Sequence, residues 1–332
     1  MTVQPISIIV CTHNRADLLP RIIGQLRAQD YPRDAFEIIV VDNCSTDQTP
    51  QVAGRFVAEP GVPVHYVVES RPGITFARNR GAEEARYPFL AYLDDDCSVR
   101  PDWLSQLRSG FDLDESVVIV AGRIILDFDK QEKPTWLGSK SERWLGAYNL
   151  PGSQSRLLEF PLYVCEANMA LTREAWEAVG GFLGMDQFGS PHVAAQEIGI
   201  LLKQIEQQGG KVAFVPSAIV HHHPGIPTRR WMLRRAYLHG VSDGILDYFL
   251  YRRSLPSVAY HTILDTAAMI VFFGFSAGSF LTIDLASAMY HLLRAAARIG
   301  KILSEMRLVG DWPRVRSWTS AHVARSRRVG LR

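Results

Sequence analysis

Three consecutive carboxylates, Asp94, Asp95 and Asp96, follow an apolar run at 89–93. A short run of aromatic and aliphatic residues is typical of a buried strand. Like charges a few ångströms apart raise each other's pKa, so a cation is expected beside them. Hard oxygen ligands suit Mg²⁺ or Mn²⁺, which often share their remaining positions with substrate phosphates. The alternative is a solvated acidic turn that caps the following helix.

A second set of candidate metal ligands is His221, His222 and His223, directly after an apolar run. Imidazole binds Mn²⁺ as well as Zn²⁺. Adjacent residues of an extended chain point to opposite sides, so hardly more than one of the three can face a metal. This argues against a three-histidine zinc site.

The first hundred residues predict the elements that position the acidic triplet. Strands are expected at 6–10, 37–41, 62–68 and 89–93, with helices at 18–26, 49–56 and around 77–81. Regular alternation of strand and helix predicts a parallel sheet with right-handed crossovers. Ligands of such sheets bind beyond the carboxyl ends of the strands, where 12–15, 42–47 and 94–96 all lie. No Gly-x-Gly-x-x-Gly follows the first strand and no P-loop occurs, which disfavours dinucleotide-binding and P-loop proteins.

The middle of the chain is less regular. A strand is expected at 118–123, a long polar and aromatic stretch at 127–155, and another strand at 211–216. Glu197 opens an amphipathic helix at 196–203, where a first-turn acid is also favoured by the helix dipole.

Four motifs, at 10–15, 41–47, 73–81 and 93–96, together resemble the signatures of family 2 glycosyltransferases with the GT-A fold. The resemblance covers about residues 5–223. It implies an α/β fold with a mainly parallel sheet flanked by helices, and Asp42 bonded to the nucleotide base. The other residues that it assigns to the nucleotide sugar are Thr12, Asn14, Arg15, Asn43, Arg78, Asp94 and Asp95.

The resemblance also implies inverting transfer from a nucleoside diphosphate sugar, with Mn²⁺ or Mg²⁺ held by Asp96. It favours His222, then His221, as the imidazole ligand, and Glu197 as the general base. Gln196 replaces the family's usual acid, and Glu166 stands where a small residue is commoner. UDP is the favoured nucleotide, while dTDP and GDP remain open. The acceptor is expected to be a saccharide or a lipid-linked saccharide in surface polysaccharide or glycolipid assembly.

The last third predicts a helical extension, so we divide the chain into residues 1–225 and 226–332. A basic helix is expected at 228–237, an uncharged segment spans 266–283, and Arg and Lys dominate thereafter. This pattern favours peripheral or re-entrant membrane association. A buried hairpin or homo-oligomer contact and a membrane span are the alternatives. Nucleic acid is disfavoured, because no recognition fold accompanies the basic helix and the net charge is only +2.

Cysteine usage and the amino terminus predict the compartment. Four cysteines show no disulfide or zinc spacing, and the chain starts directly with a strand rather than a secretion signal. A cytoplasmic protein, at the cytoplasmic face of the membrane, is expected.

The rival functions are a nucleotidyltransferase, which would carry a Gly-rich basic loop after its first strand, and a non-catalytic sugar-nucleotide-binding subunit.

Overall fold

The computed structural model describes residues 3–129, 131–160, 163–183, 197–251, 277 and 285–310. The chain divides into two compact units, which we call the sheet unit and the helical unit. The sheet unit comprises Met1–Asp127, Gly146–Pro191 and Leu201–His223, and the helical unit comprises Phe128–Leu145, His192–Ile200 and Pro224–Arg332. Apart from Ala277, the uncharged segment at 266–283 lies outside the described residues.

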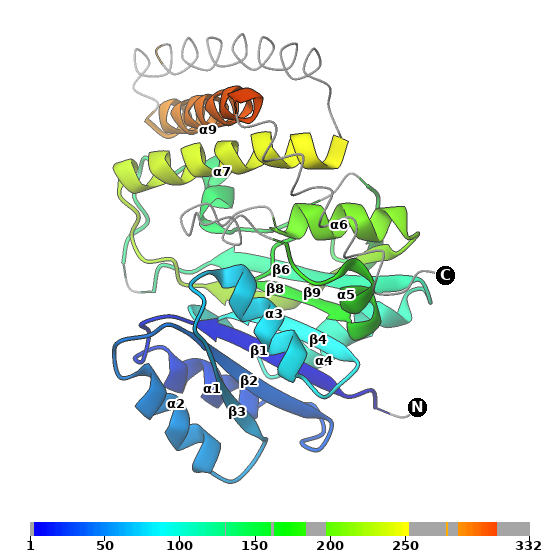
Figure 1. The fold of residues 1–332 in the computed structure, drawn as a ribbon. Coiled ribbons are helices and arrows are strands. Elements are labelled where there is room, and N and C mark those ends of the chain that lie inside the picture. Colours follow the sequence, from blue (N-terminus) through cyan, green and yellow to red (C-terminus); the bar gives the residue numbers. More distant parts are fainter. Residues whose placement is uncertain are drawn as a thin grey trace. The chain divides into compact units, whose positions relative to one another are not determined.

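The first half of the sheet unit is the expected parallel sheet. β1 (Ile6–Thr12) pairs in parallel with both β2 (Phe36–Asn43) and β4 (Phe89–Asp94), and β2 pairs with β3 (Val64–Glu69). Helices α1 (Leu19–Arg27) and α2 (Thr49–Ala58) lie on one face of these strands, and α3 (Ile74–Glu84) lies on the other (Figure 1). The two covered faces explain why β1, β2 and β4 are largely apolar and buried.

The strand register brings the predicted polar clusters to one edge. Thr12 pairs with Asp42 across β1 and β2, while Cys11 pairs with Asp94 across β1 and β4. The carboxyl ends of three strands therefore finish at the same level.

The second half of the sheet is mixed. β8 (Asn168–Thr172) runs antiparallel to both β4 and β6 (Val117–Leu126), and β9 (Lys211–His222) runs parallel to β6. The short strands β5 (Cys97–Val99) and β7 (Arg156–Leu158) are antiparallel to β9. The sheet order is β3-β2-β1-β4-β8-β6-β9-β5, with β7 also on β9. Four further helices are α4 (Trp103–Ser109), η1 (Gly110–Asp112), α5 (Arg173–Val179) and α6 (Glu197–Gln207).

A buried asparagine explains how β9 continues through Pro216. The pairing of β9 with β6 shifts between Gly122 and Arg123, which leaves an irregular stretch around the proline. Asn168 Nδ2 donates to Arg123 O at 2.9 Å and to Ala218 O at 2.8 Å. These bonds satisfy carbonyls that the bulge removes from the strand ladder, so one strand of twelve residues forms.

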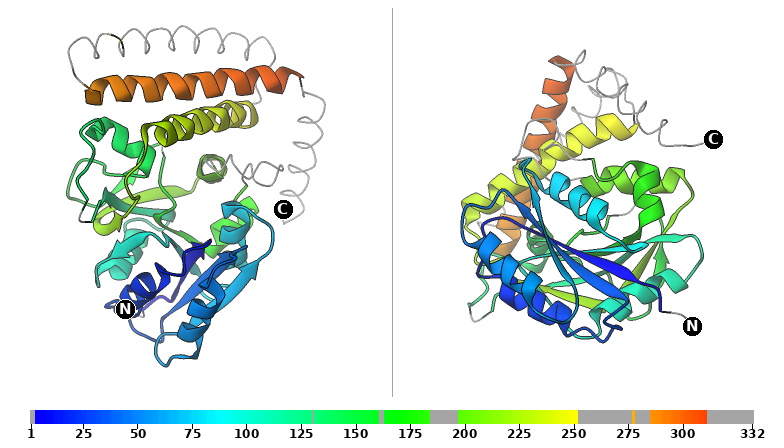
Figure 2. Two further views of the ribbon diagram at one scale, coloured as in Figure 1. Left: turned by 90° about the vertical axis from the view of Figure 1, so that its left-hand side faces the viewer. Right: turned by 60° about the horizontal axis from the view of Figure 1, so that its bottom comes forward.

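The helical unit contains η2 (Ser139–Leu145), α7 (Arg229–Tyr251) and α9 (Leu285–Gly310). Helices α7 and α9 pack against each other (Figures 1 and 2). At Gly240 a side chain would collide with the Ala297 carbonyl, so the two backbones approach too closely for any other residue. Among the described residues, no helix has the length and apolar character needed to cross a bilayer.

Candidate functional site

The acidic triplet forms a tight connection between β4 and β5. Because β5 pairs with the end of β9, Cys97 lies opposite His222, and His223 N donates to Asp96 O at 2.9 Å. His222 Nε2 is then 3.3 Å from Asp96 Oδ1. Asp96 and His222, the two residues predicted to bind a metal, are therefore neighbours although 126 positions separate them in the sequence.

The adjacent histidines have other surroundings. His223 Nε2 is 2.8 Å from Ser98 Oγ, and a ring nitrogen of His223 lies within 4.8 Å of an Asp127 carboxylate oxygen. His221 pairs with Ser98 in the strand register. His222 therefore reaches the acidic triplet through its ring, whereas His223 reaches it through its backbone N–H.

Arg15 neutralises part of the acidic triplet. Its Nη1 donates to Asp95 Oδ1 at 2.9 Å and to Asp96 Oδ2 at 2.6 Å. Burial alone would raise the pKa of the Asp96 carboxyl, but His222 and Arg15 lower it to about 2. Burial raises the pKa of Asp95 to about 6 in spite of Arg15, with the charges of Asp96 and Asp94 adding to the rise. The predicted nucleotide ligand Arg15 thus already contacts two carboxylates.

The residues at the triplet fit a hard divalent cation. Desolvation raises the pKa of Asp94, with Arg78 opposing and Asp96 adding to the shift, so a nearby cation would stabilise its ionised form. Arg15 occupies Asp96 Oδ2, whereas Asp96 Oδ1 faces the His222 ring. A carboxylate and an imidazole beside a second carboxylate form an oxygen and nitrogen donor set that suits Mn²⁺ or Mg²⁺.

Arg78 connects the acidic triplet with the residue that departs from the family pattern. It is buried on α3, with Nη2 3.8 Å from Asp94 Oδ1 and Nη1 3.7 Å from Glu166 Oε1. Glu166 is also buried. The unusual acid therefore lies beside an arginine that was predicted to contact the nucleotide.

Asp42 is held by two donors from neighbouring loops and strands. Tyr66 Oη donates to Asp42 Oδ2 at 2.7 Å, and Ser45 N donates to Asp42 Oδ1 at 2.9 Å. Asp42 is only 2% exposed. Tyr66 was not predicted as a site residue, because an aromatic residue inside a strand is usually there for packing. The hydrogen bond by which Tyr66 orients the Asp42 carboxylate follows from the folded structure and not from the sequence pattern.

The predicted residues Thr12 and Asn14 lie at the end of β1 and in the loop that follows it. Thr12 is buried opposite Asp42 in the register. Asn14 adopts a left-handed φ of 53°, donates its N–H to Ser45 Oγ at 2.8 Å, and accepts from Thr46 N at 2.7 Å. These bonds join the loop after β1 to the loop after β2.

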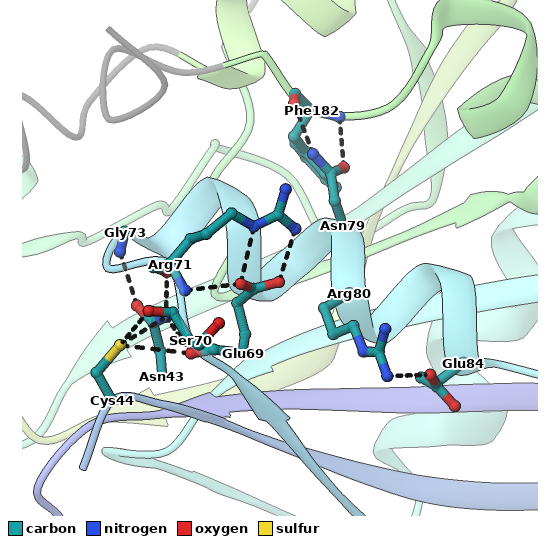
Figure 3. Close-up of polar contacts among 10 residues, drawn as sticks. All are labelled: Asn43, Cys44, Glu69, Ser70, Arg71, Gly73, Asn79, Arg80, Glu84 and Phe182. Atoms are coloured by element: carbon teal, nitrogen blue, oxygen red, sulfur yellow. Dashed lines mark hydrogen bonds and ion pairs between the residues drawn. The ribbon is translucent and has the colours of Figure 1, made fainter. Parts of the chain in front are cut away.

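Asn43 joins the loop after β2 to the turn after β3 (Figure 3). Its Nδ2 donates to Glu69 O at 3.1 Å and to Arg71 O at 2.7 Å, and its Oδ1 accepts from Gly73 N at 2.8 Å. The amide group of Asn43 is therefore used to hold backbone in place.

Asn79 connects α3 with the chain that leaves α5 (Figure 3). Its amide donates to Phe182 O and accepts from Phe182 N, both at 2.8 Å, and Trp176 Nε1 also donates to it at 3.2 Å. Phe182 is fully buried with its ring 5.2 Å from that of Tyr92.

Glu197 is the first residue of α6 and falls in the helical unit, while Gln196 lies outside the described residues. Its assignment as a general base stays a prediction.

Comparisons with known proteins identify a family from the sequence and show the same fold in solved structures. The family described as "Glycosyl transferase family 2" matches residues 7–178, just over half of the chain. A glucosyl-dolichyl phosphate glucuronosyltransferase of Haloferax volcanii is 25% identical over 266 residues, covering 77% of this chain and 81% of the relative. A Pyrobaculum calidifontis mannosyltransferase, PcManGT, solved with GDP-Man and Mn²⁺, superposes with a TM-score of 0.57 at 21% identity, covering 90% of this chain and 88% of that one. GalNAc-T7, solved with UDP, GalNAc and Mn²⁺, superposes with a TM-score of 0.50 at 17% identity. The match covers 75% of this chain and 50% of the GalNAc-T7 chain.

Proposed function

The chain belongs to glycosyl transferase family 2 and is a glycosyltransferase, and we propose that it moves a sugar from a nucleoside diphosphate to an acceptor hydroxyl with inversion. The observation that carries this proposal is the meeting of Asp96, His222 and Arg15 at the carboxyl edge of the sheet. This is where α/β sheets bind their ligands. Solved relatives with the same fold hold GDP-Man or UDP together with Mn²⁺, which supports a nucleotide sugar donor here.

Asp96 and His222 would hold Mn²⁺ or Mg²⁺, with Asp94 beside them. When bound, such an ion neutralises charge that develops on the departing diphosphate. Arg78 lies within 4 Å of Asp94 and adds a fixed positive charge on the same side. Asp42 is assigned to the base, with UDP favoured over dTDP and GDP.

Glu197 is assigned as the base that takes the proton of the acceptor hydroxyl. The acceptor oxygen then bonds to the anomeric carbon while the bond from that carbon to the diphosphate oxygen breaks, which inverts the configuration. A positioned base contributes about 10²- to 10⁴-fold in rate. Glu197→Gln should therefore lose transfer while it retains nucleotide binding.

The acceptor proposed is a saccharide or lipid-linked saccharide at the cytoplasmic face of a membrane, in polysaccharide or glycolipid assembly. A relative named for a dolichyl phosphate substrate supports this class.

The test is transfer and donor hydrolysis across UDP, GDP and dTDP sugars with Mn²⁺ or Mg²⁺. Asp96→Asn and His222→Gln should each lower turnover by at least about 100-fold and weaken donor binding in the presence of Mn²⁺. Asp112→Asn, at a carboxylate 69% exposed, is the matched control and should behave like the wild type. Donor binding that ignores chelators, or equal activity of Asp96→Asn and the control, would contradict the proposal.

A further inference from the structure

The first two turns of α7 carry a concentration of positive charge. Arg229, Arg230 and Arg234 are exposed, and Arg235 is half-buried. The first turn of α7 contains no acidic residue. Among the described residues, none of the four guanidinium groups forms an ion pair with a carboxylate.

This arrangement opposes the electrostatics of a helix. The amino end of a helix is its positive end, where anions stabilise it and cations do not. Arg230 and Arg234 are four residues apart, so their like charges also repel each other along one side of the helix. The helix start therefore lacks a negative partner that would stabilise it.

Large apolar side chains are exposed among these arginines. Trp231 is 44% exposed and Ile226 is 42% exposed. The Arg235 guanidinium lies 5.3 Å from the Trp231 ring centroid, and Arg229 lies 5.8 Å from that of Trp136. Stacking of this kind leaves the charge in place while it orders the side chains. Residues 226–234 therefore combine exposed basic and exposed apolar side chains.

We propose that Ile226, Arg229, Arg230, Trp231 and Arg234, the α7 patch, dock on the surface of an anionic lipid bilayer. Basic side chains next to such a surface bind its negatively charged head groups. Tryptophan prefers the interface between head groups and acyl chains, where its ring is buried and its N–H stays hydrated. A soluble phosphate would use the arginines but leaves Trp231 and Ile226 unexplained, so the lipid surface accounts for more of the patch.

In the sequence, the patch residues precede the uncharged segment at 266–283, and the proposal does not depend on the transfer reaction. Its test is sedimentation of the full chain with phosphatidylglycerol vesicles and with phosphatidylcholine vesicles. Binding to the anionic vesicles should weaken as salt rises. Arg230→Glu/Arg234→Glu should lower the partition coefficient by at least about tenfold, and Trp231→Ala should lower it with little change in its salt dependence.

The matched charge control is Arg33→Glu/Arg55→Glu, which reverses two exposed arginines of the sheet unit. Val57→Ser, at a side chain 49% exposed, is the matched apolar control. Both should bind vesicles like the wild type, and circular dichroism should show that every variant is folded. Equal binding by the α7 variants and their controls, equal binding to both kinds of vesicle, or full displacement by inorganic phosphate would overturn the proposal. Each α7 variant should still hydrolyse the donor in the absence of vesicles, so that a failure of the membrane proposal can be distinguished from a failure of the proposed function.

Discussion

At the scale of single residues, Tyr66 determines how the Asp42 carboxylate is presented. Burial and the bond to Asp42 raise the pKa of the Tyr66 hydroxyl above its usual range, so it stays protonated as a donor at neutral pH. With Ser45 N on the other oxygen, each carboxylate oxygen has one fixed donor, and the remaining lone pairs are available to a ligand.

Tyr66→Phe should therefore weaken donor binding without changing the chemical step. We expect the donor KM to rise about 3- to 10-fold with kcat nearly unchanged, because the lost contact affects ground state and transition state equally. Steady-state kinetics and calorimetry with the free nucleoside diphosphate measure the effect. Tyr87→Phe removes a hydroxyl bonded to Asp34 O and is the control. A fall in kcat at constant KM would contradict this role.

Residue types predicted which side chains to consider but not how they pair. The register of β1, β2 and β4 follows from apolar runs, so Asp42 and Asp94 could be placed at one edge from sequence. The contact of Arg15 with two carboxylates, and that of Arg78 with Glu166, depends on loop conformations that no periodicity encodes.

At the scale of elements, Gly180 and Gly181 end α5 and lead into Phe182. Both have left-handed φ values, 79° and 81°. A Cβ on Gly181 would lie 2.7 Å from Asn79 Oδ1, whereas one on Gly180 would have no neighbour within 4 Å. Both glycines thus require a left-handed backbone, but only Gly181 lacks the space for a side chain.

Substitution by alanine separates these two effects. Each variant carries the left-handed cost of about 1–2 kcal/mol, and Gly181→Ala also displaces the Asn79 amide from Phe182. We expect Gly181→Ala to lower the free energy of unfolding by about 1–2 kcal/mol more than Gly180→Ala. Urea denaturation followed by tryptophan fluorescence measures both. Equal losses would mean that the Asn79 contact adds nothing to stability.

The elements that sequence predicts well are those with long apolar runs and local connections. The strands around Ile8, Ile39 and Leu90 are of this kind, and the structure confirms that they pair in parallel. β5 and β7 have three residues each, too few for a periodic pattern. The strand that begins at Lys211 was expected to stop at Pro216, whereas β9 continues to His222. Sequence patterns could not predict this, because the asparagine that bonds the Ala218 carbonyl, Asn168, lies 50 positions earlier in the chain.

At the scale of the whole molecule, we expect the stability of the two compact units to depend differently on pH. In the helical unit, the rings of His239 and Trp144 are nearly perpendicular, and their centroids are 5.5 Å apart. Burial and the charges of Arg235 and Arg143 lower the pKa of His239 from 6.5 to about 4. The unfolded chain therefore binds the proton at higher pH than the folded unit does, so stability is lost as pH falls from about 6.5 toward 4.

We expect the helical unit to loosen in mild acid before the sheet unit does. Hydrogen exchange of the full chain, corrected for intrinsic rates, should show α7 and α9 amides losing protection between about pH 7 and pH 5, by about 1–3 kcal/mol. Amides of β1, β2 and β4 should change less. His239→Phe keeps an aromatic edge against Trp144 but cannot bind a proton, so it should flatten the response of α7 and α9. An unchanged pH response in this variant would show that another group controls the stability of the helical unit.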